Sequence, residues 1–375
     1  MVTEDKKIKV LSDESERERV RRRVVLSRLK RKILKHVFWV RVGILCLVIG
    51  GMCLVGASLL GYLSGTSLGY FWGLARDFVF TPMEKIGVID GRTNLVVLGK
   101  GGEGHTGAEL TDTIMFVSVR HDDSSISIVS VPRDIWLGDL RAKLNSTYYW
   151  GNKREDEGGL KLAKSSVETI VGQPVNYGVV VNFEGFLKVI DLLGGVNVEV
   201  ARGFVDEKYP IAGKEDDGCE GDPEYRCRYE TIEFKAGLQM MDSETALKFV
   251  RSRNAQGDEG TDFARSARQQ QVINAIVKRI TEPEVFTNRV RMVGLWDAFK
   301  QNVETDMSDS AAVIVARRFF EGREGRKSYV IPEELLENPP YTAEYDYLYV
   351  FVPKKGDWSE VHEWVRGVLD TDFID

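Results

Sequence analysis

Apolar residues recur along this chain with two spacings, which predict a mixture of strands and helices. Short runs rich in β-branched and apolar residues predict strands at residues 94–98, 113–120, 125–131, 176–181, 196–200, 328–331 and 347–352. Apolar positions three or four residues apart predict helices at about residues 160–171, 183–193, 243–251, 261–280, 284–301, 308–322 and 357–369. Strands and helices that follow one another in a single run predict an α/β fold: one layered domain with a central mixed sheet flanked by helices.

One apolar stretch is longer than any element of that domain. Residues 42–63 contain no charged residue and are long enough to cross a bilayer as a helix. Most charges in residues 17–41 are positive, which predicts a single-pass membrane protein with a cytoplasmic N-terminus and everything after residue 64 outside. A cleaved signal peptide is the alternative, but the apolar stretch starts late and is too long for one.

The predicted span divides the chain into five parts. We expect a basic cytoplasmic tail (1–41), a transmembrane helix (42–63), a connector (64–92), a catalytic domain (93–282) and a C-terminal α/β extension packed on that domain (283–375). The net charge of −6 over 375 residues argues against nucleic acid as a partner. Because the basic tail lies next to the predicted span, membrane lipids with anionic headgroups are its expected partner.

Two of the four cysteines lie in an acidic loop after the predicted span. Cys219 and Cys227 are eight residues apart and fall outside the membrane under this topology, so a disulfide is plausible. A metal pair is disfavoured because no histidine is nearby in the sequence, and two reduced thiols would be expected in the cytoplasm. Cys46 and Cys53 fall within the predicted span.

The segment 251–270 concentrates cationic side chains next to a helix start. Thr261 is a good N-cap, and it would place Asp262 in the first turn of the helix. Four arginines accompany them: Arg251, Arg253, Arg265 and Arg268. Guanidinium groups fixed beside a carboxylate suit a phosphate ester, although a solvated, salt-bridged helix face is the simpler interpretation.

Further charged residues lie at the ends of two predicted strands. Asp112 opens one strand, and Arg133 and Asp134 follow the next, so neighbouring strands could bring them together. Asp112 and Asp262 would then be able to hold a hard divalent cation such as Mg²⁺. Fixed positive charge, a metal and correct positioning are the main requirements of phosphoryl transfer. No histidine, serine or cysteine arrangement for nucleophilic catalysis is evident, and the glycine-rich loop at 99–104 lacks the Walker lysine.

Seven short motifs together resemble the LytR–CpsA–Psr family over roughly residues 93–282. They occur in this order: Asn94–Gly99 (NLVVLG), Thr111–Thr113 (TDT), Ser130–Asp134 (SVPRD), Lys143–Asn145 (KLN), Asp191–Val196 (DLLGGV), Ala246–Arg253 (ALKFVRSR) and Asp262–Gln270 (DFARSARQQ). The resemblance implies an extracytoplasmic α/β domain with an apolar pocket for a polyprenyl chain. It also implies Mg²⁺-dependent transfer of a glycopolymer from a polyprenyl-pyrophosphate carrier to peptidoglycan or another envelope acceptor.

The same resemblance assigns roles to residues of this chain. Asp112 and Asp262 would act near the metal. Our own candidates for the catalytic residues are Asp112, Arg133, Asp134 and Arg265, with Asp112 or Asp134 as the group that removes the proton of the acceptor hydroxyl. A third set would bind the pyrophosphate: Arg133, Arg251, Arg253, Arg265, Arg268 and Gln269.

The chain departs from the family pattern at one point, and two other functions fit the same residues. Lys100 follows Gly99 where many members have an aspartate, and Glu103 or His105 are possible substitutes. Transfer to water instead of a glycan would make the protein a polyprenyl-pyrophosphate phosphatase. A non-catalytic protein that only binds the lipid ligand is the third possibility.

Overall fold

The computed structural model describes residues 21–28, 67–101 and 109–371. The chain forms two compact units, residues 1–70 and 71–375, and the fold below is that of the second unit. Residues 21–28 of the first unit are helical. No helix within the described ranges is long and apolar enough to cross a membrane, and the predicted span at 42–63 lies outside those ranges.

A six-stranded mixed sheet forms the centre of the second unit. Its strands lie in the order β11-β6-β1-β2-β3-β12. Their bounds are β1 (Arg92–Lys100), β2 (Thr111–Arg120), β3 (Ile126–Ser130), β6 (Tyr177–Asn182), β11 (Val303–Thr305) and β12 (Lys327–Val330). β2 pairs antiparallel with both β1 and β3. β6 is parallel to β1, β12 is parallel to β3, and β11 is antiparallel to β6. The predicted central mixed sheet is therefore confirmed.

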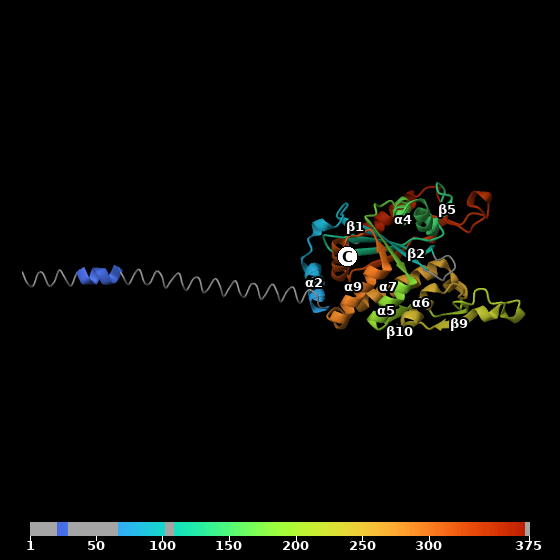
Figure 1. Cartoon of the computed structure of the whole chain (residues 1–375). Helices are drawn as coiled ribbons and strands as arrows, with labels where there is room; N and C mark the ends of the chain where they lie inside the picture. Colours follow the sequence, from blue (N-terminus) through green and yellow to red (C-terminus); the bar gives the residue numbers. More distant parts are fainter. Residues whose placement is uncertain (1–20, 29–66, 102–108, 372–375) are drawn as a thin grey trace, which may run out of the picture. The chain divides into compact units, whose positions relative to one another are not determined.

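Successive side chains along each strand point to opposite faces of the sheet, and both faces are buried. Val96 and Leu98 pack into a core with the apolar faces of α4 (Gly158–Val171) and α11 (Ser359–Thr371). Leu95 and Val117 point to the other face, towards α7 (Asp262–Thr281) and α10 (Asp309–Glu321). Figure 1 shows α4 on one side of the strands and α7 on the other.

The remaining elements complete the two layers and a second core. The other helices are α2 (Ser67–Phe80), α3 (Thr147–Arg154), α5 (Phe183–Leu193), α6 (Ser243–Arg251), α8 (Pro283–Phe286) and α9 (Arg289–Asn302). The other strands are β4 (Trp136–Leu137), β5 (Ala142–Lys143), β7 (Val196–Val200), β8 (Phe204–Pro210), β9 (Tyr229–Phe234), β10 (Gly237–Met241), β13 (Leu336–Glu337) and β14 (Val352–Pro353). The second core lies where α5, α6 and α7 pack on the β7–β10 and β8–β9 pairs.

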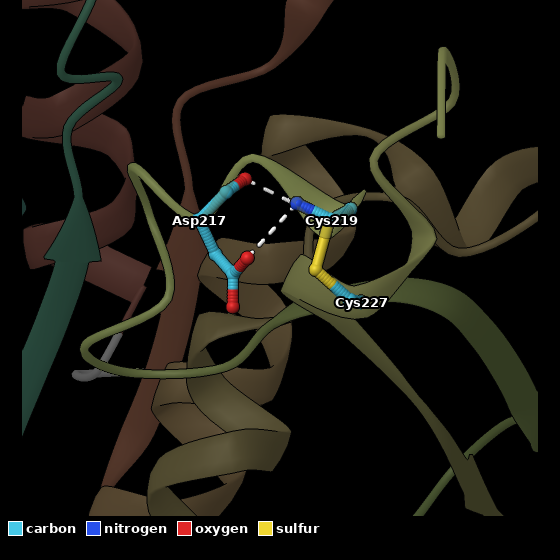
Figure 2. A group of neighbouring side chains, drawn as sticks. All are labelled: Asp217, Cys219 and Cys227. Carbon is cyan, nitrogen blue, oxygen red and sulfur yellow. Dashed lines mark hydrogen bonds between the residues drawn. A yellow bond between two sulfur atoms is a disulfide. The ribbon is translucent and has the colours of Figure 1, made fainter. Parts of the chain in front are cut away.

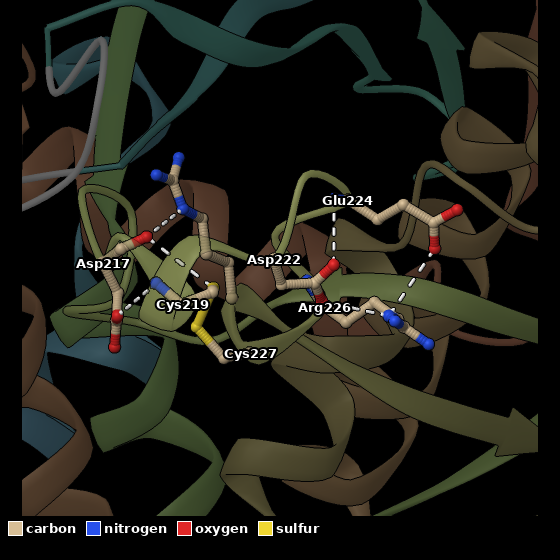
Figure 3. The surroundings of a disulfide bond; sticks show 7 residues. Asp217, Cys219, Asp222, Glu224, Arg226 and Cys227 are labelled. Carbon is tan, nitrogen blue, oxygen red and sulfur yellow. Dashed lines mark hydrogen bonds and ion pairs between the residues drawn. A yellow bond between two sulfur atoms is a disulfide. The ribbon is translucent and has the colours of Figure 1, made fainter.

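The acidic loop between β8 and β9 carries a disulfide. Cys219 and Cys227 are bonded, with their Cα atoms 5.5 Å apart (Figure 2). The Cys219 N–H donates to the Asp217 carboxylate at 2.9 Å, and Arg226 pairs with Asp222 at 3.0 Å (Figure 3). The bridge and these local contacts hold an exposed insertion in one conformation.

The residues after 282 belong to the same compact unit as those before it. They supply both edge strands of the central sheet, because β11 pairs with β6 and β12 pairs with β3. The predicted C-terminal extension thus completes the sheet in addition to packing on it.

Two predicted elements differ from the structure. The helix predicted at 284–301 is two helices, α8 and α9, because the Asn288 side chain accepts the Arg291 N–H and starts a new helix. The strand predicted at 347–352 is reduced to β14, since Asp346 and Tyr347 have positive φ angles of 51° and 57° and interrupt the extended backbone. Apolar spacing does not detect either interruption.

A close helix contact offers a test of this packing. A Cβ atom on Gly151 of α3 would collide with the Gly158 carbonyl at the start of α4, whereas a Cβ on Gly367 of α11 would meet no atom within 4 Å. We expect Gly151→Ala to lower the free energy of unfolding by about 1–3 kcal/mol through overpacking. Gly367→Ala is the matched control and should leave it unchanged or raise it by up to about 1 kcal/mol. Denaturation of the full chain followed by circular dichroism measures both, and equal stability of the two variants would contradict the packing described.

Candidate functional site

The candidate site lies at one edge of the central sheet. β1 and β3 end there, at Lys100 and Ser130, and the antiparallel β2 starts there at Thr111. The Val131 N–H donates to the Ile114 carbonyl at 2.9 Å, which keeps the segment after β3 beside the start of β2. The first turns of α7 reach the same edge. Residues from these three segments line one small pocket: Asp112, Ile114, Val131, Pro132, Arg133, Asp262, Phe263, Arg265, Ser266 and Gln269.

Arg133 is held by two carboxylates. Its guanidinium pairs with Asp112, and its Nε donates to Asp134 at 3.2 Å. Lys143 Nζ lies 2.7 Å from the other oxygen of Asp134, a residue that is only 4% exposed. The Asn145 N–H donates to the Arg133 carbonyl at 3.0 Å. Asp134, predicted to be catalytic, is therefore engaged by two cations and acts on the position of Arg133.

Arg265 joins the cluster from the first turn of α7. Thr261 caps this helix as predicted, since its side chain accepts the Ala264 N–H at 3.1 Å. Asp262 Oδ1 lies 2.5 Å from Arg265 Nη2, and the pocket brings this pair beside Asp112 and Arg133. The Asp262–Arg265 pair is local to α7, and the shared pocket brings it beside the Asp112–Arg133 pair, which lies about 130 residues earlier in the sequence.

The surroundings shift the pKa values of Arg133 and Arg265 in opposite directions. Burial lowers the pKa of Arg265, and the positive charge of Arg133 lowers it further. Burial also acts to lower the pKa of Arg133, but Asp112, Asp134 and Asp262 outweigh it, so that the pKa is raised. Because the guanidinium group is a very strong base, both arginines remain charged at neutral pH. An incoming anion therefore meets two fixed cations.

The structure does not bring Arg268 into this cluster. Its guanidinium donates to the carbonyls of Ser252 at 2.7 Å, Glu259 at 2.8 Å and Phe249 at 3.1 Å. It also pairs with the Glu259 carboxylate and lies over the Phe204 ring. Arg265 and Arg268 are three residues apart, yet only Arg265 lines the small pocket. These contacts give Arg268 a structural role in joining α6 to α7.

Two more of the predicted arginines also lie elsewhere. Arg251 stacks on the Phe183 ring, 4.7 Å from its centroid, and interacts with the hydroxyl of Tyr209. Arg253 is exposed, and its backbone N–H donates to buried Asp206 at 3.2 Å. Neither side chain lines the pocket of Arg133 and Arg265. Of the residues predicted to bind pyrophosphate, the structure therefore brings together Arg133, Arg265 and Gln269.

One participant was missed when site residues were chosen from the sequence. Lys143 completes the cluster through Asp134, although it belongs to the Lys143–Asn145 motif. In the sequence, only that motif points to Lys143. Its contact with Asp134 depends on the pairing of β5 with β4, which brings the two residues together.

Asp112 and Asp262 are the carboxylates of the small pocket that could hold a magnesium ion. Both line the small pocket, and their side chains are 42% and 31% exposed, so they are accessible to an ion. Mg²⁺ typically takes one or two carboxylates and completes its shell with water and substrate phosphates. Asp217, Cys219 and Cys227 also lie close together, but both sulfurs are bonded to each other and do not serve as metal ligands (Figure 2).

Part of the glycine-rich loop lies outside the described residues. Glu103 and His105, the possible substitutes for the missing aspartate, fall within residues 102–108 and are not placed. Lys100 is placed: its Nζ lies 5.0 Å from the centroid of the Tyr148 ring and 3.5 Å from Glu109.

A large apolar cavity lies on the face of the sheet that α7 covers. Its volume is about 500 Å³. All residues that line it are apolar: Ala75, Phe78, Val79, Leu95, Val97, Val117, Val179, Ile280, Phe286, Met292, Leu295, Trp296, Phe299, Met307, Ala312, Val313, Val315, Ala316 and Phe319. None of these lining side chains is charged, and the indole N–H of Trp296 is the one strong hydrogen-bonding group among them, which suits a hydrocarbon chain.

One face of α7 connects the charged pocket to the apolar cavity. Asp262, Ser266 and Gln269 line the pocket, and Ile273 and Ile280 follow on the same helical face. At 1.5 Å per residue, Arg265 and Ile280 are about 22 Å apart along the axis. The site is therefore suited to an amphipathic ligand with an anionic group at one end and a long apolar chain.

Several solved structures share this fold. The structure of Bacillus subtilis TagV covers 76% of this chain and 99% of its own, with a TM-score of 0.53 and 21% sequence identity. TagT bound to LIIa-WTA covers 77% of this chain and 95% of its own, with a TM-score of 0.51 and 19% identity. At these identities the likeness shows the fold alone.

Sequence relatives extend the comparison. The polyisoprenyl-teichoic acid–peptidoglycan teichoic acid transferase TagU of Bacillus cereus is 24% identical over 309 residues, which are 81% of this chain and 88% of the relative. The corresponding transferase TagV of Bacillus subtilis is 29% identical over 203 residues, 52% of this chain and 45% of the relative. Residues 81–362, well over half of the chain, match the model of the LytR_cpsA_psr family. The chain belongs to the LytR–CpsA–Psr family, as its ordered motifs predict.

Proposed function

We propose that this protein is a membrane-anchored transferase that moves a phosphate-linked glycopolymer from a polyprenyl-pyrophosphate carrier to peptidoglycan or another envelope acceptor. The observation that carries this proposal is that α7 borders two sites. Its start borders the pocket that contains Arg133 and Arg265, and its end borders the apolar cavity. A polyprenyl pyrophosphate has the same two parts in the same order. The names of the relatives agree with it, since TagU and TagV are called teichoic acid transferases that act from polyisoprenyl carriers onto peptidoglycan.

The reaction is a phosphoryl transfer at the phosphorus next to the sugar. An acceptor hydroxyl oxygen forms a bond to this phosphorus, while the bond to the bridging oxygen breaks and polyprenyl phosphate leaves. The hydroxyl proton would pass to an oxygen of Asp112 or Asp262 that is not bound to the metal, because these two carboxylates are accessible, whereas Asp134 is buried between two cations. Arg133 and Arg265 stabilise the negative charge on the phosphate oxygens through positions fixed before the ligand arrives.

Magnesium and the membrane anchor complete the proposal. Asp112 and Asp262 would hold Mg²⁺, which neutralises phosphate charge when bound. The apolar residues 42–63 would anchor the protein as a single-pass helix, with the basic tail in the cytoplasm and the catalytic unit outside the membrane. This placement puts the catalytic unit on the side where envelope acceptors are found.

Loss of either paired arginine should abolish transfer. We expect Arg133→Ala and Arg265→Ala to reduce turnover of a synthetic polyprenyl-pyrophosphate glycan at least about a hundredfold, as for other fixed donors to a developing anion. Arg366→Ala, on the exposed face of α11, is the matched control and should retain turnover. Unfolding curves establish that each variant is folded. Wild-type turnover in either pocket variant would contradict the site.

Filling the apolar cavity should discriminate between long and short carriers. Ala316→Trp places a large ring among the residues that line the cavity, so the KM for a long-chain donor should rise by about tenfold or more. A donor with a very short chain needs little of the cavity volume and should be turned over nearly normally. Ala236→Trp, at an exposed turn, is the control for the substitution itself. An equal effect of Ala316→Trp on both donors would show that the cavity does not hold the chain.

Metal removal tests the two carboxylates. A chelator should abolish transfer, and added Mg²⁺ should restore it. Asp112→Asn and Asp262→Asn should each raise the Mg²⁺ concentration for half-maximal turnover by at least about tenfold. Asp217→Asn, in the disulfide-linked insertion, should not change it. Full activity in the presence of the chelator would rule out the metal.

A further inference from the structure

A tyrosine-rich segment lies directly beside the charged pocket and has no role in the reaction described above. Residues 339–349 read PPYTAEYDYLY and contain four tyrosines. Three of them are exposed to solvent: Tyr341 at 62%, Tyr347 at 68% and Tyr349 at 41%. Large aromatic side chains gathered on one exposed segment commonly mark a binding surface.

Backbone hydrogen bonds place this segment next to the reacting groups. The Phe351 N–H donates to the Asp134 carbonyl at 3.0 Å, and the Trp136 N–H donates to the Phe351 carbonyl at 2.8 Å. Tyr349 is two residues away, so its backbone lies within about 7 Å of that contact. Its ring packs edge-on against Phe351, which in turn contacts Phe263 of the charged pocket. Tyr349, which is 41% exposed, is therefore linked to the pocket lining through Phe351 and Phe263.

The segment is fixed at several points along its length. Arg141 pairs with Asp346 and also donates to the Ala343 carbonyl at 3.3 Å. The Tyr345 ring packs edge-on against Trp136, and the Asn338 side chain donates to the Val350 carbonyl at 2.7 Å. A surface held in this way loses little conformational entropy when it binds a ligand.

We propose that Tyr341, Tyr347 and Tyr349 form a platform that binds the sugar rings of a glycan next to the reacting phosphate. Tyrosine offers an apolar ring face to the C–H groups of a sugar and a hydroxyl that hydrogen-bonds its oxygens. The inference rests on the proposed function, which places the phosphorus at Arg133 and Arg265. Both the sugar attached to that phosphorus and the sugar that attacks it must then lie near this platform.

The surroundings of Tyr349 keep its hydroxyl protonated, which suits a sugar hydroxyl as partner. Burial raises the pKa of Tyr349, and Asp262, Asp134 and Glu333 raise it further. The phenol therefore stays protonated at neutral pH and able to donate a hydrogen bond. A ring face beside a hydrogen-bond donor suits a sugar ring and its hydroxyls.

Binding measurements on the full-length protein in detergent test the platform with two soluble probes. The first is chitotetraose, four β-1,4-linked N-acetylglucosamine units, which represents a glycan acceptor. The second is N-acetylglucosamine linked through pyrophosphate to a short prenyl chain, which represents the donor. We expect Tyr341→Ala and Tyr349→Ala to weaken binding of at least one probe by about fivefold or more, as for other aromatic anchors. Tyr225→Ala, an equally exposed tyrosine in the disulfide-linked insertion, should change neither affinity.

The pattern of losses identifies the glycan. Weaker binding of chitotetraose assigns the platform to the acceptor, and weaker binding of the prenyl probe alone assigns it to the donor sugar. Tyr349→Phe should retain most of the affinity if ring packing dominates. Unchanged affinities in both alanine variants, or no binding of either probe to the wild-type protein, would overturn the platform. An absence of transfer activity despite platform-dependent binding would instead refute the proposed function.

Discussion

Two arginines, half-buried Arg133 and buried Arg265, lie in one cluster with carboxylates, and the rest of the site depends on this balance of charge. Arg133, Arg265 and Lys143 face Asp112, Asp134 and Asp262, so the cluster is close to neutral on its own. Removing one carboxylate would leave a buried charge without its partner, which is costly. A pyrophosphate diester brings two further negative charges into this neutral cluster. A divalent cation would offset them, which is the electrostatic reason for including Mg²⁺ in the proposed reaction.

Helix α7 converts this local balance into a site for a long ligand. Its first turns carry Asp262 and Arg265, and its later turns contribute Ile273 and Ile280 to the apolar side of the sheet. The other face of the same helix is anchored by Arg268, whose guanidinium bonds to carbonyls of neighbouring segments. The two arginines of α7 thus have different roles: Arg265 faces the ligand pocket, whereas Arg268 fixes the helix that presents it.

Local signals in the sequence predicted most elements, whereas contacts between distant segments decided the site. The alternation at residues 94–98 and the cap at Thr261 depend on nearby residues, and both appear in the structure. The arginines at 251, 253 and 268 looked equivalent to Arg265 because their charge is visible in the sequence but their partners are not. Phe183 and Glu259 are partners of the Arg251 and Arg268 side chains, and each lies in a different element, whereas the Arg253 side chain is exposed and only its backbone N–H bonds to Asp206. The break between α8 and α9 was missed for a related reason, since one capping asparagine outweighs a continuous apolar pattern.

The central claim is that the bond broken lies between the two phosphates of the carrier. Purified full-length protein, given a polyprenyl-pyrophosphate glycan and a peptidoglycan acceptor, tests it through the identity of its products. We predict that the reaction yields polyprenyl monophosphate and acceptor-linked glycan phosphate in equal amounts. Polyprenyl monophosphate with free glycan phosphate in place of the linked product would indicate a phosphatase. Tight binding of the carrier without either product would show that the protein binds the lipid and does not transfer its glycan.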